Sequence, residues 1–91
     1  MNMKSVYLKI VGRVQGVYFR QSTREKAKEL GIAGTVRNME DGSVEVYAEG
    51  EAEQMRLFIT WCNVGPLAAA VTKVEIHDSP LKNFDGFKII H

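Results

Sequence analysis

Cysteine is nearly absent from the sequence, and long apolar runs are absent altogether. The 91 residues contain a single cysteine, Cys62, so no disulfide can form within the chain, and a reducing compartment is the natural expectation. No stretch is apolar for long enough to form the hydrophobic region of a signal peptide or a membrane span. We therefore expect a soluble, cytoplasmic protein that acts without a membrane.

The sequence also lacks an excess of either charge. Its 12 Lys and Arg residues nearly balance its 11 Asp and Glu residues, which gives a net charge of +1. Bulk electrostatics therefore gives no reason to expect a nucleic-acid partner, and any anion site has to arise from local geometry. The length suffices for one small core. We expect a single domain over residues 1–91 and, because the set of elements forms a complete fold, a monomer.

Apolar periodicity predicts the order of helices and strands. Alternation in residues 6–11 is typical of a strand that ends at Gly12, and apolar residues at helical spacing indicate two helices further along. The predicted elements are strands over 6–11, 33–38, 43–49, 71–76 and 87–90, and helices over 21–30 and 52–64. The order β-α-β-β-α-β, with a short extra strand, predicts an α+β, ferredoxin-like split β-α-β sandwich, in which both helices cover one face of an antiparallel sheet. That fold carries many unrelated functions.

The segment GRVQGVYFR, residues 12–20, joins the first strand to the first helix and has features of an anion site. A helix start offers backbone N–H groups without partners and the positive end of the helix dipole. Gly16 lets the backbone curl so that successive N–H groups converge, and Arg20 could bind two phosphate oxygens. On spacing alone, an ordinary turn followed by a solvent-facing arginine is the more common explanation.

This segment has no nucleophilic side chain of the kind that cysteine-dependent phosphatases use. Those enzymes place a cysteine six residues before the phosphate-binding arginine, and here that position is Val14. A phosphate bound at the segment could not be transferred to a cysteine. Water would therefore have to be the nucleophile.

Asn38 is the second candidate, at the predicted end of a strand and just before the turn at residues 40–42. An asparagine in this place often bonds its own backbone. Alternatively, its amide can both donate and accept, and so could orient a water molecule. The spacing is compatible with both roles.

Three strings together resemble the acylphosphatase family: GRVQGVYFR, GTVRNMEDG at residues 34–42 and the looser GPLAAAV at 65–71. The resemblance spans nearly the whole chain. It implies a ferredoxin-like enzyme that hydrolyses small-molecule acyl phosphates without a metal or other cofactor. It also implies a role for each site residue. Arg20 would bind the substrate phosphate together with N–H groups of the loop, and Asn38 would position the attacking water; the loop residues concerned are Gln15, Gly16, Val17, Tyr18 and Phe19.

The residues present suit this reaction. The leaving group of an acyl phosphate is a carboxylate whose conjugate acid has a pKa of roughly 4, so it departs without a general acid. Phosphoryl transfer needs mainly positioning and charge stabilisation. Phosphate monoesters have a poor alkoxide leaving group, and we expect little activity on them.

Two other functions stay open at this point. The domain could bind RNA or a small anionic ligand, although its third strand is acidic and has Tyr47 as its one aromatic residue, which disfavours RNA. It could also be a regulatory domain of a larger enzyme, since acylphosphatase-like domains occur at the front of hydrogenase-maturation proteins. We assign no catalytic role to His77, to the turn carboxylates, or to Cys62, which lies on the apolar face of the second predicted helix.

Overall fold

A computed structural model describes residues 2–91 and confirms the predicted order of elements. The elements are β1 (Met3–Arg13), α1 (Phe19–Leu30), β2 (Ala33–Asn38), β3 (Val44–Glu51), α2 (Ala52–Cys62), β4 (Ala70–Asp78) and β5 (Phe87–Ile89). Helix α1 begins two residues earlier than predicted, and α2 ends two residues earlier. Strand β1 does not end at Gly12, because a register shift between Val11 and Gly12 keeps it paired with β4. The glycine therefore marks a bulge rather than the end of the strand.

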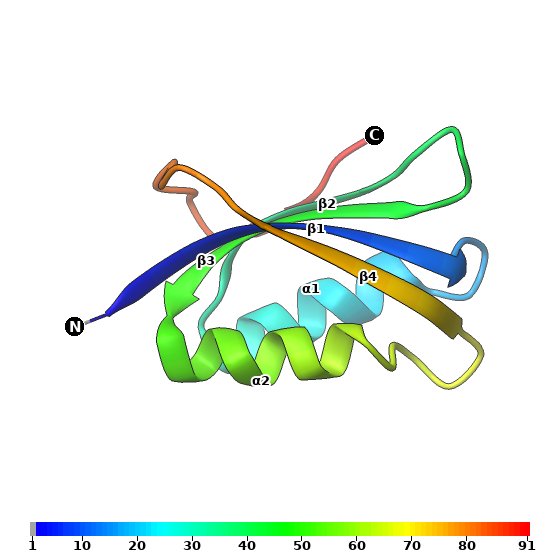
Figure 1. Cartoon of the computed structure of the whole chain (residues 1–91), viewed down its shortest axis with the longest axis horizontal. Helices are drawn as coiled ribbons and strands as arrows, with labels where there is room; N and C mark the ends of the chain where they lie inside the picture. Colours follow the sequence, from blue (N-terminus) through cyan, green and yellow to red (C-terminus); the bar gives the residue numbers. More distant parts are fainter. Residues whose placement is uncertain (1) are drawn as a thin grey trace.

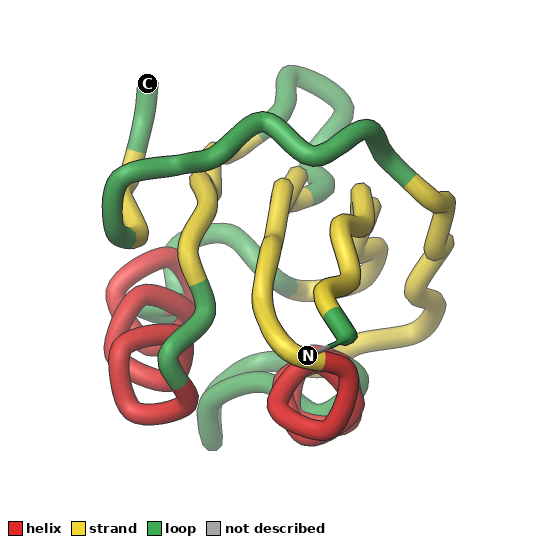
Figure 2. Tube along the Cα trace, turned by 90° about the vertical axis from the view of Figure 1, so that its left-hand side faces the viewer, coloured by secondary structure: helices red, strands yellow, loops and turns green. Residues whose placement is uncertain are grey.

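The five strands form one sheet in the order β4-β1-β3-β2-β5. The four longer strands pair antiparallel, as predicted, but β5 runs parallel to β2, so the sheet is mixed. The reason is the connection from β4. Residues 79–86 cross from one edge of the sheet to the other on the face away from the helices (Figure 2), and this crossing sets the direction of β5.

Both helices lie on one face of the sheet, and the core fills the space between the two layers (Figure 1). Helix α1 buries Phe19, Thr23 and Ala27. The other buried apolar side chains of this core come mainly from β1, β3 and α2: Val6, Leu8, Ile10, Val44, Val46, Ala48, Met55, Phe58 and Cys62. No helix among the described residues is long and apolar enough to cross a membrane.

The opposite face of the sheet is partly covered by the loop over residues 79–86. The carboxylate of Glu49, 4% exposed, accepts hydrogen bonds from the backbone N–H groups of Lys82, Asn83 (3.2 Å) and Phe84 (3.0 Å). The ammonium of Lys82 lies 4.0 Å from the ring centroid of Tyr47. The aromatic residue that an RNA-binding strand would expose is therefore already in contact with the chain's own loop.

Candidate active site

Five residues, 14–18, connect β1 to α1, and their alternating burial shapes the loop. Val14 and Val17 are buried in the core, at 0% and 7% exposure. Between and after them, Gly16 and Tyr18 take left-handed backbone conformations, with φ of 74° and 61°. Left-handed residues at such close spacing can turn neighbouring N–H groups toward a common point, as in an anion-binding nest.

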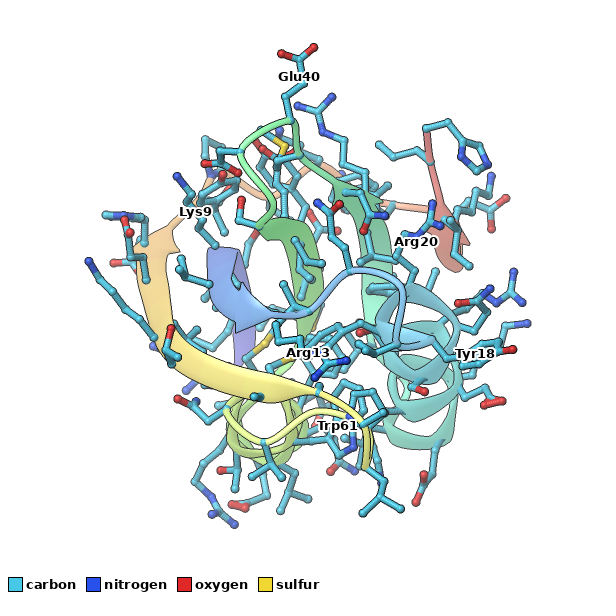
Figure 3. All side chains as sticks on the ribbon, turned by 90° about the vertical axis from the view of Figure 1, so that its right-hand side faces the viewer. Lys9, Arg13, Tyr18, Arg20, Glu40 and Trp61 are labelled. Carbon is cyan, nitrogen blue, oxygen red and sulfur yellow. The ribbon has the colours of Figure 1, made fainter. Side chains whose placement is uncertain are left out.

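Helix α1 begins at this loop without a side-chain cap. Its N-cap residue is Tyr18, which makes no capping hydrogen bond within the described residues, and the first turn contains no acidic residue. The first helical N–H groups and the positive end of the helix dipole are therefore available to an anion. Arg20, the second residue of α1, adds a guanidinium at the same place (Figure 3).

Gln15 joins the loop to the β2–β3 hairpin. Its side-chain amide donates to the backbone carbonyls of Met39 (2.8 Å) and Ser43 (2.9 Å). Both side-chain N–H donors are used in this way, so the Gln15 side chain has no donor left for a phosphate. Its contribution to an anion site is limited to its backbone N–H and to holding the loop beside the hairpin.

Asn38, the last residue of β2, lines a cavity that the loop and the start of α1 also border. The cavity has a volume of about 250 Å³. Its lining residues come from the loop, from the start of α1 and from the end of β2: Val14, Gly16, Tyr18, Phe19, Arg20, Gln21 and Asn38. The structure thus brings Arg20 and Asn38, 18 positions apart in the sequence, to one cavity.

The side chain of Asn38 does not make the turn hydrogen bond that its position allowed. Within residues 2–91 its Oδ1 atom is buried and has no hydrogen-bond partner. The turn is instead held by Asp41, whose carboxylate accepts from the backbone N–H (3.0 Å) and the hydroxyl (2.6 Å) of Ser43. A buried amide oxygen without a partner costs about 1–3 kcal/mol, so Asn38, which lines the cavity, has an acceptor that the described residues leave unsatisfied.

Two charged side chains of the hairpin, Arg37 and Asp41, have partners that do not line the cavity. Arg37 donates to the Glu45 carboxylate at 2.7 Å, and this hydrogen bond raises the pKa of the Arg37 guanidinium. Hydrogen bonds from Ser43 and the ammonium of Lys9, 2.9 Å away, lower the pKa of Asp41. By contrast, no ion pair of Arg20 is found in the described part of the chain.

The other candidate nucleophiles and ligands lie away from this cavity. Cys62 is fully buried on α2, and burial raises the pKa of its thiol. His77 lies on β4, where its ring is 6.3 Å from that of Tyr7. Across residues 2–91 no three His, Cys, Asp or Glu side chains are grouped to hold a metal ion.

Two of the expected phosphate-binding residues, Gln15 and Val17, do not line the cavity, whereas Val14 and Gln21, which were not expected, do.

No local pattern in the sequence indicates which residues pack behind the loop. The ring of Phe19 packs against Trp61, with centroids 5.7 Å apart, and against Gly65, whose backbone has a φ of 73°. Gly65 therefore supports the first residue of α1 from behind. A glycine and proline after a helix signal its end, but they do not reveal such a contact.

The chain matches known proteins over nearly its whole length. The family model for acylphosphatase matches residues 6–89. The acylphosphatase of Marinobacter nauticus is 44% identical over 100% of both chains, and that of Pseudomonas paraeruginosa is 54% identical over 84% of each. The solved structure of an acylphosphatase from Coxiella burnetii superposes with a TM-score of 0.94 at 35% identity, covering 98% of this chain and 94% of that one. The sequence match, the named relatives and the shared fold agree, and the chain belongs to the acylphosphatase family of enzymes.

Proposed function

We propose that this protein hydrolyses small acyl phosphates by direct attack of water on phosphorus. The phosphate would occupy the cavity between Arg20 and the N–H groups of residues 15–20, where the guanidinium and the helix start stabilise its charge. Asn38 would hold the attacking water. The observation that carries this proposal is the buried, unpartnered Oδ1 of Asn38, a residue that lines the same cavity as Arg20.

The reaction needs few groups, and the cavity provides them. Because a carboxylate leaves without being protonated, the site requires no general acid. The amide oxygen of Asn38 accepts a hydrogen bond from the water and turns a water lone pair toward phosphorus. The second proton of the water can pass to a phosphate oxygen of the substrate, since among the described residues no carboxylate and no imidazole lines the cavity to act as a base.

The same reasoning extends to the setting of the reaction. We propose that residues 1–91 act as one monomeric, cytoplasmic domain that needs neither a metal nor another cofactor. The substrate would be held mainly through its phosphate, so acyl groups of several kinds would be accepted. Phosphate monoesters would be poor substrates because their alkoxide leaving group is much more basic than a carboxylate.

Steady-state hydrolysis of benzoyl phosphate in the presence of EDTA tests this proposal. Arg20→Ala should lower kcat/KM by about 10²–10³-fold and abolish inhibition by inorganic phosphate. Asn38→Ala should lower kcat by about 10²-fold, because it removes the group that positions the water, and should leave phosphate inhibition nearly unchanged. Arg24→Ala is the matched control, since Arg24 lies one turn further along α1 and does not line the cavity.

Three results would contradict the proposal. One is wild-type activity that disappears with the chelator. Another is an equal loss in Arg24→Ala and Arg20→Ala, which would indicate a general effect of charge. The third is a folded wild type that turns over an alkyl phosphate as fast as benzoyl phosphate.

A further inference from the structure

Tyr18 occupies a position that does not suit a tyrosine. Its φ of 61° and ψ of 25° lie in the left-handed region, where a bulky side chain is an outlier and glycine or asparagine fits at lower cost. It is also the N-cap of α1, a place that favours small polar residues, and its side chain makes no capping bond within the described residues. Neither the backbone nor the helix start gives a reason for an aromatic ring here.

The ring of Tyr18 does not contribute to the core either. The residue is 76% exposed, whereas Val17 and Phe19 on either side are buried. Within residues 2–91 no aromatic partner and no hydrogen bond of its hydroxyl group is found. Nevertheless, Tyr18 lines the cavity that contains Arg20 and Asn38. Strain retained beside a binding cavity points to a role in that cavity rather than in stability.

The direction of the reaction places the acyl group on the Tyr18 side. In phosphoryl transfer the attacking and leaving oxygens lie roughly in line through phosphorus. The water would be at Asn38, which also borders a second hollow formed by the β2–β3 hairpin. Figure 3 shows Arg20 between Tyr18 and Glu40, the latter at the tip of that hairpin. A leaving group opposite the hairpin therefore departs past Tyr18.

We propose that Tyr18 is a specificity-determining residue, whose ring contacts the acyl group of the bound substrate and favours flat, apolar acyl groups over small ones. This inference rests on the proposed function. The left-handed backbone turns the side chain of residue 18 out of the core, so the ring lies at the mouth of the cavity without filling the phosphate site. A planar group such as benzoyl can stack on an exposed phenol ring, whereas an acetyl group offers little surface for contact.

The test compares kcat/KM for benzoyl phosphate and acetyl phosphate in the wild type and in Tyr18→Gly and Tyr18→Phe. Tyr18→Gly should lower the value for benzoyl phosphate about three- to tenfold and that for acetyl phosphate less than about twofold. Tyr18→Phe, which keeps the ring, should retain the wild-type ratio. Glycine accepts the left-handed backbone, so Tyr18→Gly is expected to fold. Inhibition by inorganic phosphate should be the same in all three proteins.

Leu81→Ala is the control for loss of an exposed apolar side chain. Leu81 is 51% exposed in the loop over residues 79–86, away from the start of α1 (Figure 1), and its removal should leave the ratio unchanged. An equal loss for both substrates in Tyr18→Gly would overturn the inference, because it would show a disturbed phosphate site. An unchanged ratio would overturn it as well. A wild type that fails to hydrolyse acetyl phosphate would instead refute the proposed function itself.

Discussion

The contact between Gly65 and Phe19 should make Gly65→Ala a damaging substitution, although Gly65 does not line the cavity. A Cβ atom added to Gly65 would lie 2.5 Å from Cε2 of Phe19 and 3.2 Å from its Cδ2 and Cζ atoms. Ordinary contact between carbon atoms is about 3.5–4.0 Å, so the ring would have to move by about 1 Å. Phe19 is only 2% exposed and its ring packs on Trp61, so it cannot move without displacing its neighbours.

The magnitude follows from two contributions. Forcing an extra methyl group into a packed site costs about 1–3 kcal/mol. Placing a Cβ on a left-handed residue adds about 1–2 kcal/mol. We therefore expect Gly65→Ala to lower the free energy of unfolding by about 2–5 kcal/mol. Because Phe19 precedes Arg20 in α1, a displacement of about 1 Å should also lower kcat/KM by up to about 10²-fold.

Gly86→Ala separates the two contributions. Gly86 has a φ of 71°, close to the 73° of Gly65, but a Cβ atom at Gly86 would meet nothing within 4 Å. The Gly86→Ala variant should therefore be destabilised only by the backbone contribution, and it should keep its activity. Urea unfolding followed by circular dichroism, together with kcat/KM for benzoyl phosphate, measures both effects. If the two variants were equally stable and equally active, the reasoning from the Phe19 contact would be refuted.

Three further substitutions test other contacts. Gln15→Ala removes both hydrogen bonds to the hairpin and should lower the free energy of unfolding in urea by about 1–3 kcal/mol. It should also lower kcat, and an unchanged kcat would show that these hydrogen bonds do not position the loop. Tyr7 has its pKa raised to about 12 from 10.0, first by burial and then by its hydrogen bond to Glu45. Its stabilising contribution is complete below pH 10 and is lost as the pH rises toward 12, so Tyr7→Phe should lose less stability than the wild type over that range, and parallel losses would contradict this. Glu49→Gln weakens the acceptor for the amides of residues 82–84, so hydrogen exchange there should accelerate while kcat/KM stays unchanged; unaltered exchange would show that the carboxylate does not hold the loop.

The fold could be predicted because most elements carry their own periodic signal, whereas their exact ends depend on neighbours. Strand β1 continues through Gly12 because β4 pairs with it beyond the bulge. Helix α1 begins at Phe19 rather than at residue 21, with the Phe19 ring packed against Trp61 of α2. The parallel direction of β5 results from the path of residues 79–86 across the sheet. None of these contacts leaves a local pattern in the sequence.

The site could be predicted from the sequence only because its motifs resemble those of a known family. Spacing alone left Arg20 as a possible solvent-facing residue and Asn38 as a possible turn residue. The structure removes the second possibility, because Asp41 makes the turn bonds and the Oδ1 atom of Asn38 makes none within the described residues. The two hydrogen bonds from the Gln15 side chain to the hairpin could not be foreseen. The carbonyl groups that accept them lie near Gln15 only when the hairpin folds against the loop.

Three local features that lower stability occur together around the cavity, and this gives a reason for the site that is independent of family resemblance. An aromatic residue is left-handed at Tyr18, the start of α1 has no side-chain cap, and the Oδ1 atom of Asn38 is buried without a partner in residues 2–91. Other buried polar side chains have partners: the hydroxyl of Thr23 donates to the Phe19 carbonyl at 2.7 Å, and Glu49 accepts bonds from three amides. The start of α2 also lacks a side-chain cap in the described part of the chain, but its first turn contains an acidic residue, Glu53, whereas that of α1 contains none. Natural sequences usually break such local rules where function requires it.

A bound phosphate and an ordered water would satisfy the helix start and the amide oxygen at once, so ligand binding and stability should be coupled here. Inorganic phosphate should therefore raise the unfolding midpoint of the wild type and raise it less in Arg20→Ala, because a ligand at free concentration L that binds only the folded state stabilises it by RT ln(1 + L/Kd), which falls as Kd rises. An equal rise in both proteins would place the phosphate elsewhere.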